Sequence, residues 1–241
     1  MSRRHLCGFL AVAACASPAP RLAPDAAPND DVAAPASACR PAGVSGSPRT
    51  VAEVVVLANA LPRPLELPCF LESLDRPLQV HAALSTVSLQ PAPAARSPRI
   101  FLFLGDVIMS VVPEGQGQQL LEMGQLVAAD RSVKAELRFP ISEPVGPDYP
   151  FAHVRDEGGT TCRFCHPREA PAPEISPSAF SSGAFSPIYR ARVDVESLRA
   201  ERSRCDEAAE PARCAILRAL FDHGEVRGRD FPMGVPTAFD H

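Results

Sequence analysis

The sequence predicts an α+β fold that is mainly β, with an antiparallel sandwich or small barrel over about residues 65–141. An N-terminal helix and a C-terminal helical hairpin complete the predicted fold. The central stretch consists of short β-prone runs separated by turn residues such as those at 113–117, and helix signals lie on either side of it. Several short strands at this spacing are typical of a sandwich or a small barrel.

Five β-prone runs make up the central stretch, and the last of them alternates most clearly. The runs are Leu78–Leu84, Ile100–Leu104, Val107–Val112, Leu120–Val127 and Ser132–Phe139. In the last run, apolar and charged residues occupy alternate positions: Val133, Ala135, Leu137 and Phe139 against Lys134, Glu136 and Arg138. Successive side chains of a strand point to opposite faces of a sheet, so this run predicts a strand with one apolar face and one charged face.

A helix is predicted to begin after Thr50, because a Thr N-cap followed three residues later by Glu53 can satisfy two backbone donors of the first turn. This helix should run to about Ala60. Pro62 and Pro64 then end it, since proline cannot continue the hydrogen-bond ladder and restricts the residue before it.

The C-terminal hairpin is predicted from two helices that follow residue 190. The first spans roughly Val195–Arg204 after an Asp194 cap, and the second begins at Pro211 and ends near His223 before Gly224. Cys205 and Cys214 flank the bend between the two helices. We therefore expect a disulfide between them, which closes a short loop and contributes about 2–3 kcal/mol.

The domain organisation predicted along the chain has four parts. Residues 16–48 are rich in Ala, Pro, Asp and Ser and cannot bury enough apolar surface to offset ordering, so they are interpreted as a disordered tether. Cys39 within the tether is the exception, since a disulfide can attach it to the folded domain. The parts are a signal peptide at 1–15, the tether at 16–48, a β-rich domain at 49–150, and at 151–241 a Cys-x-x-Cys-His loop with the hairpin packed on it.

The N-terminus has the pattern of an export signal. Two arginines stand within residues 1–5, and an apolar run of signal-peptide length follows from Leu6 to Ala14. The run ends in Val12-Ala-Ala-Cys15, which resembles the bacterial lipobox. This resemblance implies that Cys15 is lipidated and anchors an exported protein to a membrane on the periplasmic side. Ala16, in place of the aspartate that retains lipoproteins at the inner membrane, favours the outer membrane.

The N-terminal residues also fit two other interpretations, which the pattern favours less. Ala14-Cys15-Ala16 can be an A-x-A site, after which an ordinary signal peptidase would release a soluble protein at Ser17. Residues 1–16 can also be a disordered start of a cytosolic protein.

Export predicts an oxidising environment, in which cysteines are bridged, metal-bound or modified. The net charge of −4 with interspersed signs argues against a nucleic-acid partner.

The motif Cys162-Arg-Phe-Cys-His166 has the spacing of a covalent haem-attachment site. It resembles the motif of c-type cytochromes over these five residues. The resemblance implies thioether links from Cys162 and Cys165 to haem c, with His166 as the proximal iron ligand. The residues at 156–161 disfavour a helix before the motif. For the sixth ligand, Met233 is preferred over His153 or His223.

Other readings of this motif remain open at the level of sequence. Cys162 and Cys165 can form a local disulfide, or join His153 and His166 as four zinc ligands. A thioredoxin-like redox pair requires a helix N-terminus after a strand, which Pro167 does not favour.

The favoured function is an envelope lipoprotein that carries haem c and transfers electrons to an unidentified redox partner. The alternative is a non-catalytic, disulfide-stabilised surface lipoprotein with a structural or partner-binding role. In that case all six cysteines after Cys15 are bridged. No hydrolase elbow, phosphate-binding loop or metalloprotease motif occurs in the sequence. This pattern favours an electron carrier or a binding protein over an enzyme.

Overall fold

The computed structural model describes residues 39–238 of the chain. The predicted signal peptide, the lipidation site Cys15 and almost all of the predicted tether lie outside these residues. The described residues belong to one unit, Ala36–His241. Within the described part, no helix is long and apolar enough to cross a membrane.

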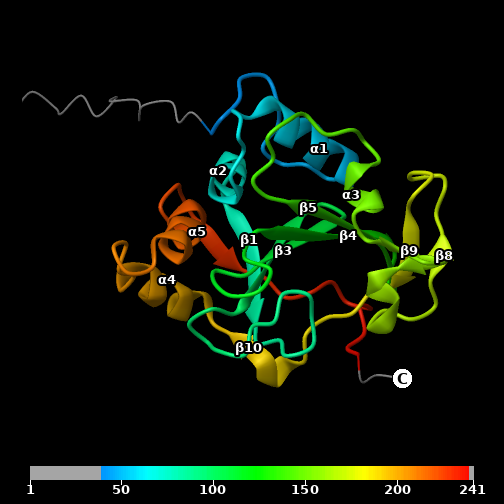
Figure 1. Cartoon of the computed structure of the whole chain (residues 1–241). Coiled ribbons are helices and arrows are strands. Elements are labelled where there is room, and N and C mark those ends of the chain that lie inside the picture. The colour runs from blue at the N-terminus through cyan, green and yellow to red at the C-terminus, as the bar shows by residue number, and fades with distance from the viewer. Residues whose placement is uncertain (1–38, 239–241) are drawn as a thin grey trace, which may run out of the picture. The chain divides into compact units, whose positions relative to one another are not determined.

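A nine-stranded sheet forms the centre of the fold, with the strand order β10-β1-β2-β3-β4-β5-β9-β8 and β11 also paired to β1 (Figure 1). All neighbours along this order are antiparallel, whereas β11 runs parallel to β1. The strands are β1 (Leu78–Ala83), β2 (Arg99–Leu104), β3 (Val107–Val111), β4 (Leu120–Ala128), β5 (Arg131–Arg138), β8 (Ala170–Pro171), β9 (Phe180–Gly183), β10 (Arg192–Val193) and β11 (Val226–Gly228). A separate two-stranded ribbon joins β6 (Arg155–Asp156) to β7 (Gly159–Thr160).

The mainly β, α+β class predicted from the sequence is confirmed, and β1–β5 coincide with the five predicted runs. The sheet is not closed into a barrel, so that part of the prediction is wrong. Its strands also belong to one sheet and not to two packed layers. The reason is that β8–β11, which come from the later part of the chain, add to the two sides of the β1–β5 meander and leave it open.

Helices occupy the segments before the meander and after it. They are α1 (Val51–Ala60), α2 (Leu67–Ser73), α3 (Tyr149–Ala152), α4 (Val195–Ser203) and α5 (Pro211–Phe221), with 3₁₀ turns η1 (Thr161–Phe164) and η2 (Tyr189–Ala191). The side chain of Thr50 accepts a hydrogen bond from the Glu53 amide, as the N-cap prediction requires. The Glu53 carboxylate accepts from the amide of Arg49, one residue earlier than in a capping box. The helices α1, α4 and α5 match the three predicted helices, whereas α2 and α3 were not predicted.

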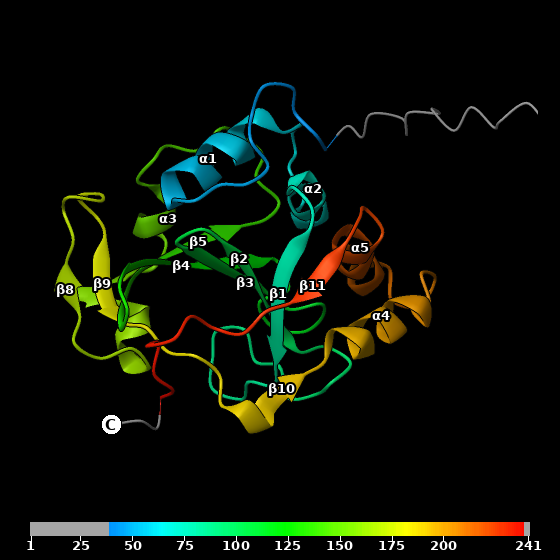
Figure 2. The same ribbon diagram turned by 180° about the vertical axis from the view of Figure 1, so that it is seen from behind.

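The hydrophobic core lies between one face of the sheet and the helices. Residues of α1, α2, α4 and α5 share this core with the apolar alternate positions of β1–β5. In β5, Val133, Ala135 and Leu137 are buried in the core, which confirms the apolar face predicted for this strand. Figures 1 and 2 show α1 and α2 on one side of the sheet and α5 beside β1 and β11. The opposite face of the sheet is therefore left for other contacts.

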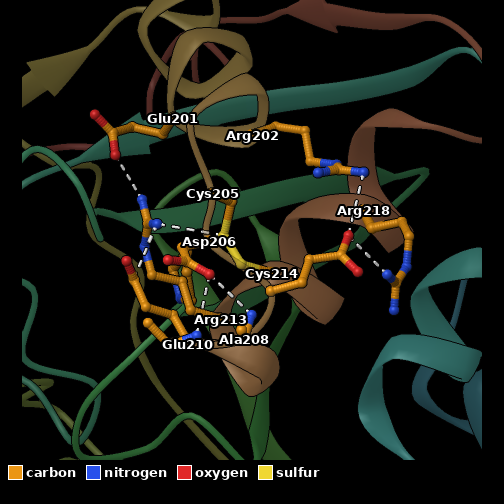
Figure 3. Close-up of a disulfide and its surroundings, with 12 residues drawn as sticks. Glu201, Arg202, Cys205, Asp206, Ala208, Glu210, Arg213, Cys214 and Arg218 are labelled. Atoms are coloured by element: carbon orange, nitrogen blue, oxygen red, sulfur yellow. Dashed lines mark hydrogen bonds and ion pairs between the residues drawn. A yellow bond between two sulfur atoms is a disulfide. The ribbon is translucent and has the colours of Figure 1, made fainter.

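Two disulfides hold helices to neighbouring segments. Cys205 bonds Cys214 with Cα atoms 5.6 Å apart, the pairing predicted for the bend between α4 and α5 (Figure 3). Cys39 bonds Cys69 of α2 across 30 residues of sequence, so the end of the predicted tether is attached to the folded domain. The buried Arg213 lies beside the first of these disulfides, with its guanidinium 3.5 Å from Cys205 Sγ.

Candidate functional site

The second face of the sheet carries polar and aromatic side chains in place of a second apolar core. The strands that place their alternate residues in the core place the intervening residues on this face, because side chains alternate along a strand. The cavity-facing residues of the central strands include Arg99 and Phe101 of β2, Ile108 and Ser110 of β3, Glu122 of β4, and Ser132, Lys134 and Glu136 of β5. Two basic and two acidic groups thus lie on one face of four adjacent strands.

A cavity of about 520 Å³ lies against this face. Its volume falls within the range of roughly 300–1,000 Å³ that is typical of ligand and cofactor sites. Segments distant in sequence form its walls: residues 83–89, the Cys162–His166 motif, residues 184–187, and the C-terminal segment through Phe231 and Val235. The cavity therefore places the Cys162–His166 motif next to the charged face of the sheet.

The C-terminal segment is held over the cavity by aromatic and backbone contacts. The ring of Phe231 packs edge-on against Phe101 and Phe103, each with centroids 5.1 Å away. Further along, the amide of Ser186 donates to the carbonyl of Pro236 at 2.8 Å. Figure 2 shows this segment leaving β11 and crossing the molecule toward the C-terminus.

The strand face that lines the cavity is called the cavity floor, and Arg99 binds several of its polar side chains. Its guanidinium donates to the hydroxyls of Ser110 and Ser88 at 2.7–3.0 Å and forms an ion pair with Glu122. Ser110 in turn donates to Gln90, which is fully buried. The charges of Arg99 and Glu122 are therefore compensated within the floor.

The motif itself forms a compact turn at the edge of the cavity. A 3₁₀ turn spans Thr161–Phe164, and the Thr160 hydroxyl accepts a hydrogen bond from the amide of Cys162. Glu169, after the motif, accepts from the amide and the hydroxyl of Thr160. The two ends of the loop are thereby joined. Helical geometry starts only at the motif, in agreement with the absence of a helix before it.

His166 is fixed to strand β9 through one backbone carbonyl. Its Nδ1 lies 2.8 Å from the carbonyl oxygen of Gly183, and the Gly183 amide donates to the carbonyl of Pro167 at 3.0 Å. The imidazole also stacks on the ring of Phe185, with a centroid distance of 5.3 Å. Since Nδ1 donates to a carbonyl, Nε2 carries the lone pair. This is the arrangement in which protein histidines coordinate a metal.

The electrostatics of the site keep His166 neutral. Burial, together with the nearby charge of Lys134, lowers the pKa of His166 to about 3. Neutral imidazole is the form that binds a metal. Burial also lowers the pKa of Lys134, to about 8, so this side chain is mostly protonated at neutral pH.

The two motif cysteines are thiols in this structure and are not bonded to each other. The local disulfide that the sequence left open is therefore absent from the structure. Burial raises the pKa of the Cys162 thiol, which is the opposite of the lowered pKa that a redox-active thiol requires. Among residues 39–238, no group of three or more His, Cys, Asp or Glu side chains is placed to hold a metal ion, and a Cys2His2 zinc site is therefore not assembled.

The structure does not bring the proposed sixth ligands to this cavity. Met233 is 99% exposed and does not line the cavity, although its neighbours Phe231 and Val235 do. The same exposure excludes a core-packing role for Met233. His153 packs on Tyr149 with ring centroids 3.9 Å apart, and His223 lies 3.6 Å from Glu72; neither lines the cavity. The exposed position of Met233 follows from Pro232 and Gly234, which form a turn at the surface.

Sequence reasoning missed Arg99, Glu122 and Gly183 as parts of the site. Lys134 was assigned to the charged face of its strand, which is correct, but not to a functional site. Two signals could have identified it: it is the only lysine of the chain, and it stands between core positions of a strand. Gly183 carries no such signal, because it acts through its backbone carbonyl.

Comparisons with known proteins do not assign the chain to a family. No protein-family model matches it, and no curated protein or solved structure is significantly similar to it. The support for a function therefore comes from the geometry of the site.

Proposed function

We propose that this chain is an exported lipoprotein that carries one covalently attached c-type haem in the cavity and transfers electrons. The observation that carries the proposal is the 2.8 Å hydrogen bond from His166 Nδ1 to the Gly183 carbonyl. It orients the imidazole and leaves Nε2 for iron, while Cys162 and Cys165 line the same cavity as unbonded thiols. This donor set fits haem c.

The role of each residue follows from its chemistry. Cys162 and Cys165 would hold the haem through thioether bonds: each thiol would add across a vinyl group, with the S–C bond replacing the vinyl π bond and the thiol proton going to the other vinyl carbon. No oxidant is required, but both sulfurs must be reduced, as they are here. His166 would bind the iron through Nε2, since Nδ1 is engaged by the Gly183 carbonyl. Bound haem supplies a one-electron redox couple.

Apolar side chains on the cavity wall suit the porphyrin plane, because a buried cofactor gains from contact with apolar surface. The wall includes Leu84, Leu89, Phe101, Ile108 and Phe231.

Export is supported by the cysteines of the described residues. The structure contains the disulfides Cys39–Cys69 and Cys205–Cys214. Disulfides are rare in reducing compartments and common outside them. The lipobox-like segment ending at Cys15 supports a lipid anchor, and Ala16 supports the outer membrane as its destination.

The test is the full chain expressed with its signal in a bacterial envelope that has an active haem-attachment system. We expect the denatured protein to retain haem, seen as the mass of one added haem and as Soret and α bands after reduction. Cys162→Ser combined with Cys165→Ser should abolish retention, because no thioether can form. Phe164→Leu is the matched control: it changes an exposed position inside the motif and should retain haem. A colourless wild-type protein without the added mass would contradict the proposal.

A further inference from the structure

The carbonyl of Gly183, next to the cavity-lining residue Ala184, accepts two hydrogen bonds. One comes from His166 Nδ1 at 2.8 Å and the other from Lys134 Nζ at 3.1 Å. These donors come from different parts of the fold, since Lys134 lies on β5 and His166 follows the 3₁₀ turn. Strand β9, which pairs with β5 through Ser181–Gly183, brings the carbonyl between them. Lys134 and His166 are therefore coupled through a single oxygen atom.

Lys134 is a buried cation without an anionic partner of its own. Only 9% of it is exposed, and its second hydrogen bond goes to the Ser132 hydroxyl at 2.6 Å. Two carboxylates line the same floor, but Glu122 pairs with Arg99 and Glu136 pairs with Arg138. Within residues 39–238, no carboxylate oxygen forms an ion pair with Lys134 Nζ at 4.0 Å or less. Its positive charge is consequently left facing the haem-attachment motif.

We infer that Lys134 is a positioning residue that acts on His166 through the Gly183 carbonyl and raises the reduction potential of the haem. The inference rests on the proposed function. A carbonyl oxygen already engaged by an ammonium group is a weaker acceptor for a second donor, so the His166 N–H is held less strongly. The imidazole then donates less electron density to iron, and the ferric state is stabilised less.

The charge of Lys134 acts in the same direction as the hydrogen bond. Reduction of iron from ferric to ferrous removes one unit of positive charge from the cavity. A nearby uncompensated cation in a region of low dielectric therefore favours the ferrous state. Both effects predict that a neutral side chain at position 134 lowers the potential.

The test uses the haem-loaded full chain with Lys134→Met, which keeps the length of the side chain without the charge. We expect the equilibrium constant for one-electron reduction to fall about tenfold, or about 59 mV. Lys134→Arg retains a cation and should keep most of the wild-type potential. Arg168→Met is the matched control, because it removes a cation two residues after His166 that is half exposed and paired with Asp130. It should change the potential little.

A second readout does not depend on haem. In the Cys162→Ser/Cys165→Ser variant, nitrogen NMR should find the His166 proton on Nδ1. Adding Lys134→Met should move that proton resonance downfield, because the hydrogen bond to Gly183 strengthens. A merely structural role for Lys134 would not produce this shift.

The outcomes separate the inference from the proposed function. Absence of covalent haem in the wild type overturns the proposed function, while the NMR comparison still tests the coupling of Lys134 to His166. Retained haem with an unchanged or raised potential in Lys134→Met overturns the inference. If Lys134→Met does not fold, Lys134→Gln takes its place in both measurements. If Lys134→Met and Lys134→Gln both fold but lose the haem, Lys134 is needed for haem attachment, and the inference is also overturned.

Discussion

A buried lysine is unfavourable unless its charge is compensated, and Lys134 obtains only neutral oxygen atoms as hydrogen-bond partners. Its desolvation is the largest cause of its lowered pKa, about 8 against 10.5 for an exposed lysine. A side chain retained at such a cost of stability is typical of functional sites. At the scale of single residues, stability and the proposed redox function therefore place opposite demands on position 134.

The lowered pKa of Lys134 predicts a distinctive dependence of stability on pH. Between about pH 8 and 10.5 the unfolded chain holds a proton on Lys134 that the folded chain has lost, so raising the pH favours folding. Below about pH 8 both states are protonated, and Lys134 contributes no pH dependence. We expect the free energy of unfolding to rise by up to about 3 kcal/mol across this window, relative to Lys134→Met.

The measurement is urea unfolding of the Cys162→Ser/Cys165→Ser variant, with and without Lys134→Met, from pH 7 to pH 10.5. This background has no motif thiols, so their titration does not interfere. Parallel pH profiles for the two proteins would show that the Lys134 ammonium is not desolvated in the folded state.

At the scale of elements, the α4–α5 hairpin combines a disulfide with a buried charge network. Arg213 of α5 is 4% exposed and donates to Glu201 at 2.6 Å and to Glu210 at 3.2 Å (Figure 3). The Nη2 of Arg213 also donates to the carbonyl of Arg96, a residue of the segment that connects β1 to β2. The hairpin is thereby held to the sheet region by polar contacts as well as by its apolar residues in the core.

The two disulfides should differ in their contributions to stability because they close loops of different length. Cys205–Cys214 spans 9 residues and Cys39–Cys69 spans 30. Loss of loop entropy in the unfolded chain gives about 2.5 and about 3.5 kcal/mol, respectively. Replacing both cysteines of a pair by serine should lower the free energy of unfolding, and the loss should be larger for Cys39–Cys69 than for Cys205–Cys214. Denaturant titration measures both losses.

Arg218→Ala is the control for the hairpin, because it removes only an exposed ion pair with Glu207 and should cost less than 1 kcal/mol. A larger loss for the Cys205–Cys214 pair than for the Cys39–Cys69 pair would contradict the loop-length argument. It would indicate that the short disulfide also maintains the Arg213 network in the folded state.

At the scale of the whole molecule, the sheet depends on segments from the C-terminal part of the chain. One edge of β1 pairs with β10 at Ala82–Ala83 and with β11 at Leu78–Val80. The last β-bridge, Ser186 to Thr237, joins the C-terminal segment to the chain after β9. The cavity is therefore complete only when the C-terminal segment, which lines it through Phe231 and Val235, is in place.

For the anchor, we expect Cys15→Ala to abolish labelling with palmitate. The variant should also lose the signal-peptide cleavage that normally follows lipidation. The measurement is metabolic labelling, with the mature mass and membrane fractionation determined in parallel; Cys7→Ala, a cysteine earlier in the same segment, is the control. A Cys15→Ala protein that is cleaved and released as in the wild type would favour the A-x-A alternative.

Local pattern was sufficient for much of the fold. The alternation in β5, the Thr50 cap of α1 and the Pro211 start of α5 are confirmed, and so is the spacing that predicted Cys205–Cys214. These features depend on residues close in sequence, whose backbone preferences and side-chain periodicity act over one or two turns of structure. The motif at Cys162–His166 was also found from its spacing alone, and its role in haem attachment stays a prediction.

By itself, then, the sequence determined the mainly β class, the five central strands and three helices. Only the tertiary structure decided that the sheet stays open, that Cys39 pairs with Cys69, and that Met233 is exposed. It also decided that Gly183 receives both Lys134 and His166. These outcomes depend on strand pairing between segments tens of residues apart, which is selected by the burial of whole faces and not by local periodicity.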